Sequence, residues 1–195
     1  MTTSDDAELA RVPDPDFDHL NQLLAVVRGQ DDRGIVLSLA AFAEDTLGRL
    51  LLTYLREGRQ TKDLLEGFNA PLGTLSNRIK AAYAVGLLTR DQYDDLEISR
   101  RIRNAFAHDW QGVSLERQDI KSLIAQLHCY SFTGHPPPTD PKQRLVDALT
   151  TILVELRVQI AQHRKHNRRA PFAGLRLMAG EPDPQQYQSA RTKPG

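Results

Sequence analysis

The chain has little of what marks a secreted protein or a strongly nucleic-acid-binding one. It contains a single cysteine, Cys129, among 195 residues. An internal disulfide is therefore excluded, and a reducing compartment is expected. The 25 basic side chains are balanced by 25 acidic ones. This balance argues against a broadly basic surface for nucleic acid, although a local basic patch stays open.

Long hydrophobic runs are also missing. The longest apolar stretch, residues 35–43, is interrupted by Ser38 and is far too short to span a bilayer. The N-terminus carries Asp5, Asp6 and Glu8, where a signal peptide needs positive charge followed by apolar residues. We therefore expect a cytoplasmic protein without a membrane segment.

What is present suits one helical domain. The chain is 40% hydrophobic and 26% charged, which is ordinary for a soluble domain with one core. Apolar residues recur at helical spacing, and we find no strand-period run and no internal repeat. We predict an all-α bundle of about five to seven helices over residues 17–168. Residues 1–16, which are acidic, and residues 169–195 are expected to be disordered.

Capping residues divide this span into helices. Ser, Thr and Asp are favoured at helix starts because their side-chain oxygens accept hydrogen bonds from free backbone N–H groups. Thr89 followed by Gln92 is a capping-box pattern. The expected helices are 17–27, a long central one at 33–57 capped by Asp31 or Asp32, a short one capped by Thr61, one from Thr74 to about Gly86, one beginning after Thr89, one at 115–132 capped by Ser114, and one opened by Asp140 and Pro141.

The most informative stretch, residues 97–110, reads E-I-S-R-R-I-R-N-A-F-A-H-D-W. Its helix has a narrow apolar stripe formed by Ile98, Ile102, Ala105 and Phe106. An Arg-Asn pair, Arg103 and Asn104, precedes His108 close to the expected helix end, beside Trp110.

Arg103 and His108 are five residues apart, so on an ideal helix they point about 140° away from each other. They would meet poorly within one chain. Two copies of the helix that cross in a homodimer would bring them together. We therefore predict a homodimer with a shared polar seam.

Three blocks of the chain resemble the mannitol operon repressor family. They are 32–37 (DRGIVL), 64–74 (LLEGFNAPLGT) and 100–108 (RRIRNAFAH), and the likeness extends over residues 31–127. That family is described as a transcriptional regulator of mannitol uptake genes, with a helical-bundle fold and no recognisable DNA-reading module. The resemblance implies a non-enzymatic regulator that acts through protein contacts and needs no cofactor.

The third block also resembles the wider HEPN group, whose mark is an Arg, a polar residue and, a few residues later, a His. In active HEPN ribonucleases two protomers join these residues and cleave RNA without a metal, using the neighbouring 2′-hydroxyl. Carried over to this chain, His108 would exchange the proton, Arg103 would stabilise charge on the phosphate, and Asn104 would orient one of them. Histidine suits this role because its unperturbed pKa is about 6.5. The resemblance implies a ribonuclease or toxin as the alternative function.

A structural role is the competing interpretation of the same residues. Arg103, Asn104 and His108 would then cap carbonyls, pair with Glu44 and hold the dimer together. Glu44 and Asp45 lie in the middle of the long central helix. Either they reach solvent or pair with Arg49, or Glu44 faces Arg103 and holds an arginine in place.

Other motifs are weaker. Residues 82–95 resemble the first part of a helix-turn-helix. Gln92, however, is polar at a position where that motif requires an apolar residue. Direct sequence-specific DNA binding is therefore not expected. The basic stretch 164–169 either touches phosphate or complements a helix end. His163 and His166 have no Cys or carboxylate at matching spacing, so no metal site is predicted.

Overall fold

The computed structural model describes residues 15–109, 111–128 and 138–170. These ranges contain seven helices and no strand, so the prediction of an all-α bundle is confirmed. The helices are α1 (Pro15–Val27), α2 (Asp32–Tyr54), α3 (Arg59–Leu65), α4 (Leu75–Ala84), α5 (Arg90–His108), α6 (Gln118–Ile124) and α7 (Pro141–Lys165). Trp110 and Cys129 lie outside the described residues.

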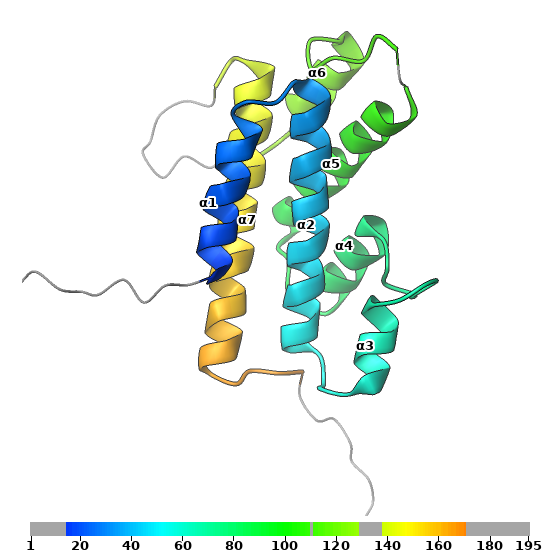
Figure 1. Cartoon of the computed structure of the whole chain (residues 1–195), viewed down its shortest axis with the longest axis vertical. Helices are drawn as coiled ribbons and strands as arrows, with labels where there is room; N and C mark the ends of the chain where they lie inside the picture. Colours follow the sequence, from blue (N-terminus) through cyan, green and yellow to red (C-terminus); the bar gives the residue numbers. More distant parts are fainter. Residues whose placement is uncertain (1–14, 110, 129–137, 171–195) are drawn as a thin grey trace, which may run out of the picture.

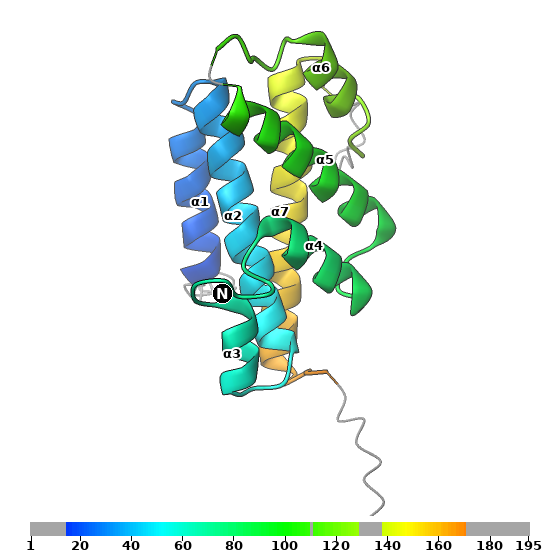
Figure 2. The same cartoon turned by 90° about the vertical axis from the view of Figure 1, so that its right-hand side faces the viewer.

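The helices form two layers that meet at α2. Figure 1 shows α1, α2 and α7 side by side along the long axis of the molecule. Figure 2 shows α4 and α5 crossing the other side of this layer obliquely, with α3 and α6 at opposite ends. α2 contacts α1, α3, α4, α5 and α7. Any side chain on α2 that faces the second layer therefore lies near α4 or α5.

α2 is central because it is apolar over most of its circumference. Ten of its residues are buried, among them Ile35, Leu39 and Leu47. It starts at the predicted cap, since the Asp31 side chain accepts a hydrogen bond from the Gly34 N–H at 2.8 Å. It ends at Tyr54 rather than near residue 57.

Three other predicted helix starts are also confirmed. Thr74 accepts from the Asn77 N–H at 3.3 Å and caps α4. Thr89 and Gln92 form the capping box of α5 in both directions. Asp140 caps α7, and Pro141 stands at its first position, where the missing N–H costs nothing.

The prediction of a helix at 115–132 was wrong in its extent. α6 covers only Gln118–Ile124, and its N-cap is Arg117 rather than Ser114. It ends early because Arg144 of α7 donates hydrogen bonds to the carbonyls of Ile124, Ala125 and Leu127 at 2.9–3.1 Å. Residues 129–132, the end of that predicted helix, lie outside the described residues.

Two further boundaries differ from expectation. α3 begins at Arg59, and the hydroxyl of Thr61 donates to the Arg56 carbonyl at 2.6 Å instead of capping the helix. α1 begins at Pro15, inside the segment expected to be disordered.

Arg169 and Ala170, the first residues of the expected disordered tail, are held by hydrogen bonds. The Ala170 N–H donates to the Tyr54 carbonyl at 2.7 Å. Arg169 donates to the Leu55 carbonyl at 3.0 Å. These two bonds close the C-terminal end of α2. Residues 1–14 and 171–195, the rest of the predicted disordered ends, lie outside the described residues.

Candidate functional site

The apolar stripe of α5 fixes which of its side chains reach solvent. Ile98, Ile102 and Phe106 are buried, as predicted from their spacing. Arg101, Arg103 and His108 are consequently exposed, and Asn104 is half-buried. Glu97 and Arg100 form an ion pair at 2.8 Å on this helix.

Gln92 ties the start of α5 to the first layer of helices. Its amide donates to the Glu155 carboxylate of α7 at 2.7 Å, besides closing the capping box. This is the polar residue that argued against a helix-turn-helix. Its bond across to α7 explains why a polar side chain stands at a buried position of α5.

The C-terminal end of α5 is capped by Arg33, which the sequence patterns did not single out. The Arg33 guanidinium donates to the Phe106 carbonyl and, at 2.6 Å, to the Asp109 carbonyl. The Asp109 carboxylate pairs with Arg117 at 2.6 Å. The 32–37 block of the sequence therefore supplies the cap for the helix that carries the candidate site.

Three of the four predicted site residues line one pocket, which we call the α4–α5 pocket. Its volume is about 240 Å³, and α2, the start of α4 and the middle of α5 form its walls. Glu44, Arg103 and Asn104 all line it, together with Gly73, Thr74, Leu75, Ser76 and Arg100. Glu44 thus shares a pocket with Arg103. His108 does not line it.

The polar contacts inside this pocket are few. Arg103 donates to the side-chain oxygen of Asn104 at 3.2 Å. No ion pair joins Glu44 to an arginine side chain among the described residues. Asp45, the neighbour of Glu44, pairs with Arg49 at 2.7 Å, as one of the two interpretations required.

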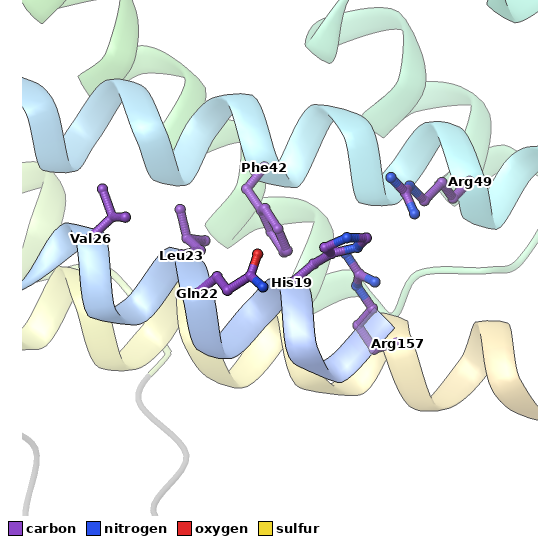
Figure 3. A pocket seen from close by; sticks show the side chains of 7 residues that line it. All are labelled: His19, Gln22, Leu23, Val26, Phe42, Arg49 and Arg157. Atoms are coloured by element: carbon purple, nitrogen blue, oxygen red, sulfur yellow. The ribbon is translucent and has the colours of Figure 1, made fainter. Parts of the chain in front are cut away.

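A second hollow lies between α1, α2 and α7, with a volume of about 340 Å³ (Figure 3). Arg157 of α7 is only 1% exposed there, and its guanidinium lies over the Phe42 ring at 4.9 Å from the centroid. A cation over an aromatic face is attracted to the ring electrons, which offsets part of the cost of burial. Arg157 adjoins Leu156 in the apolar stripe of α7, and no sequence pattern marked it.

A buried carboxylate joins α5 to the chain just after α6. Asp95 is 2% exposed and accepts the backbone N–H of His128 at 3.0 Å. Its Oδ1 also lies 2.9 Å from His128 Nδ1. Burial raises the pKa of Asp95, and the hydrogen bond to Asp95 raises the pKa of His128. Asp95 and His128 line neither pocket. Their hydrogen bonds join the segment after α6 to α5.

The segment between α3 and α4, which we call the Phe68 loop (residues 66–73), reaches out from the side of the bundle (Figure 1). Phe68, at the tip of this loop, is 98% exposed. Gly67 and Asn69 on either side have φ of 98° and 62°, a left-handed backbone that turns the chain sharply at the tip. The Leu72 N–H donates to the Leu64 carbonyl at 2.8 Å and closes the base of the loop.

The basic end of α7 is occupied by local contacts. His163 Nδ1 lies 3.0 Å from the Arg168 carbonyl, and its ring meets Tyr54 edge to face. Within the described ranges, no three His, Cys, Asp or Glu side chains are grouped so that they could hold a metal ion. None of the helices described has the length and apolar character needed to cross a membrane.

An all-helical bundle with a polar pocket against its central helix is the class that these features define. The mannitol repressor family matches residues 61–165, more than half of the chain, and the chain belongs to this family. The match begins later than the likeness noted in the sequence and extends through α7. The resemblance to the HEPN group stays a prediction.

Two curated relatives are the mannitol operon repressors of Escherichia coli strains K12 and O6:H1. Each is 26% identical over 118 residues, which are 58% of this chain and 60% of the relative. The chain therefore spans about 60% of the length of these relatives. A chain in the X-ray structure of the MtlR–HPr complex from Escherichia coli has the same fold, with a TM-score of 0.50 and 24% identity. That likeness covers 75% of this chain and 96% of the other.

Proposed function

We propose that this chain is a transcriptional regulator of the mannitol repressor type that acts by binding another protein. The observation that carries the proposal is the Phe68 ring, almost fully exposed on a loop that lies inside the family-matched region. Support for a protein partner comes from the structural neighbour, which belongs to a complex with HPr. We take HPr, or a protein of its kind, as the partner.

The ring is held out by an ordered loop rather than by a disordered one. Arg78 of α4 donates to the Leu72 carbonyl at 2.9 Å and to the Leu65 carbonyl at 3.0 Å, on both sides of the loop. A loop backbone fixed in place before binding loses little conformational entropy when the partner arrives. Aromatic rings of this kind are common among the residues that dominate interface energies.

The charges around Phe68 favour a protein over a nucleic acid. The exposed residues beside it include Asp63 and Glu66 as well as Lys62. Asp63 pairs with Arg59 at 3.6 Å, so the charges here are balanced and offer no net positive patch to a phosphate backbone. We therefore expect an apolar hollow on a folded protein as the receptor for the ring.

Calorimetric titration of HPr into the full chain tests this proposal. We expect binding by the wild type and a loss of about 30-fold in affinity for Phe68→Ala, the effect of removing a dominant interface side chain. Val158→Ala is the control, because this exposed side chain lies on α7, away from the Phe68 loop. If Phe68→Ala binds HPr as tightly as the wild type, the Phe68 loop is not the binding surface. If the wild type does not bind HPr, HPr is not the partner.

Metal-independent RNA cleavage by a homodimer is the second candidate function. The observation that favours it is the outward position of Arg103 and His108, both exposed on α5 and both free to meet a second copy. In this proposal the two copies would place Arg103 of one against His108 of the other. The experiment that separates it from the regulator is described in the Discussion.

A further inference from the structure

The α4–α5 pocket is lined by cationic and anionic side chains from different helices. Arg100 and Arg103 come from α5, and Glu44 comes from α2. Arg100 is already partly neutralised by Glu97, so Arg103 is the cation with the least compensation. A site of this kind can hold a ligand that is negatively charged at one end and carries hydroxyl groups at the other.

The start of α4 adds hydrogen-bond donors between these walls. The side-chain oxygen of Thr74 already accepts a hydrogen bond from the Asn77 N–H. The backbone N–H groups of Leu75 and Ser76, in the first turn of a ten-residue helix, have no carbonyl partner within the helix. Ser76 contributes its hydroxyl as well. These donors suit an oxyanion, because they add hydrogen bonds to the positive charge that Arg103 supplies in the same pocket.

Hydrogen bonds from Arg78 hold the walls in place. Arg78 donates to the Glu44 backbone carbonyl at 2.7 Å and to the Leu72 carbonyl at 2.9 Å, which joins α2 to the end of the Phe68 loop. A pocket whose walls are already fixed has little ordering left to do when a ligand enters. The arrangement therefore has the rigidity expected of a binding site.

Size limits the ligand. A volume of about 240 Å³ lies below the roughly 300–1,000 Å³ of pockets for drug-sized molecules. It is too small to enclose a nucleotide and suits one sugar-sized body. We infer that the α4–α5 pocket binds a small hydroxylated organic anion, a sugar or polyol phosphate, with its phosphate at Arg103 and the start of α4. Glu44 and Asn104 accept and donate hydrogen bonds to its hydroxyl groups.

The inference is independent of whether the chain binds HPr. It is tested by calorimetric titration of the full chain with glucose 6-phosphate, inorganic phosphate and glucose. Glucose 6-phosphate should bind, inorganic phosphate should bind at least tenfold more weakly, and glucose alone should give no signal. No heat from glucose 6-phosphate at millimolar concentration would overturn the inference.

Two matched variants of α5 test whether the phosphate of the ligand binds at Arg103. Arg103→Gln should weaken glucose 6-phosphate binding roughly 10- to 100-fold, the usual effect of losing a hydrogen bond to a charged group. Arg101→Gln is the control, because Arg101 is exposed on the same helix but does not line the pocket. Equal weakening by both variants would mean general charge attraction and would overturn the inference.

Glu44→Gln separates the two ends of the ligand. It should weaken the sugar phosphate several-fold, since an amide oxygen is a poorer acceptor for hydroxyl groups than a carboxylate. The affinity of this variant for inorganic phosphate should equal that of the wild type or exceed it, because a negative charge is removed. Identical effects on both ligands would contradict a hydroxyl-binding role for Glu44 and reduce the site to an anion site.

Discussion

The guanidinium of Arg78 lies directly against the backbone of α2 at Gly48. A methyl group at Gly48 would come within 2.8 Å of Arg78 Nη1. That nitrogen donates to the Glu44 carbonyl, and the rest of the guanidinium holds the carbonyls of Leu65 and Leu72. One small residue in the central helix therefore allows one arginine to position the loop and the pocket.

Gly48→Ala should lower the free energy of unfolding by about 1–3 kcal/mol. Alanine gains about 1 kcal/mol in helix propensity. Against this gain, Arg78 must shift from hydrogen bonds that are worth about 1.5–3 kcal/mol each when the donor is charged. Urea denaturation measures the difference. In an Arg78→Ala background the same substitution should stabilise the protein, and a stabilising effect in the wild type would contradict the contact.

Phe106 and Phe68 form a matched pair for testing the fold. Phe106→Ala should cost about 3–5 kcal/mol, because its ring is fully buried under α5. Phe68→Ala should change stability by less than about 0.5 kcal/mol, because its ring is almost fully exposed. Both values come from the same denaturation series. A loss below about 1 kcal/mol for Phe106 would mean that α5 is rotated differently about its axis.

His128 should make stability depend on pH above its unfolded pKa of about 6.5. Its pKa is raised by the hydrogen bond to Asp95, with smaller contributions from the charges of Asp91 and Asp94. The stabilisation from a raised pKa is fully present below the unfolded pKa of about 6.5 and is lost as pH rises through the folded value. The raised pKa of Asp95, caused by burial, acts in the same direction at lower pH.

Denaturation at pH 6 and pH 8.5 measures this dependence. The wild type should lose stability between the two values, and His128→Asn should lose less, since its amide can still donate to Asp95 but does not titrate. Equal pH dependence in the two proteins would show that another group is responsible.

Local patterns predicted several helix starts, because such caps are decided within three or four residues, whereas Thr61 and Ser114 were wrongly predicted as caps. Thr74, Thr89 with Gln92, and Asp140 were recognisable for that reason. The length of α6 was not predictable in this way. Arg144, about twenty positions further along the chain, takes up its last carbonyls, and the sequence of α6 contains no sign of it.

The same distinction applies to the candidate site. The motif singled out Arg103 and Asn104, and one of two interpretations had Glu44 facing Arg103; all three line one pocket. Arg33 caps carbonyls more than seventy residues away, and Arg78 reaches one that is 34 residues away. Such contacts follow from the packing of helices, so no spacing rule within one helix could reveal them.

RNA cleavage is the test that divides the two candidate functions. Purified wild type, His108→Ala, Arg103→Ala and Arg101→Ala should each be incubated with a single-stranded RNA in EDTA. If the chain is a ribonuclease, the first two substitutions should abolish cleavage, because the proton exchanger or the phosphate-binding cation is lost. Arg101→Ala should keep it. Cleavage that survives in every variant would indicate a contaminating nuclease.

The outcome must be read together with the oligomeric state. On an ideal helix Arg103 and His108 point about 140° apart, and only Arg103 lines the α4–α5 pocket. One chain therefore does not unite them, and cleavage should require a dimer in sedimentation at micromolar concentration. Cleavage by a monomer would contradict the shared seam. A dimer that does not cleave RNA would contradict the ribonuclease. Arg103 would then act in the α4–α5 pocket, and the chain would function as a regulator.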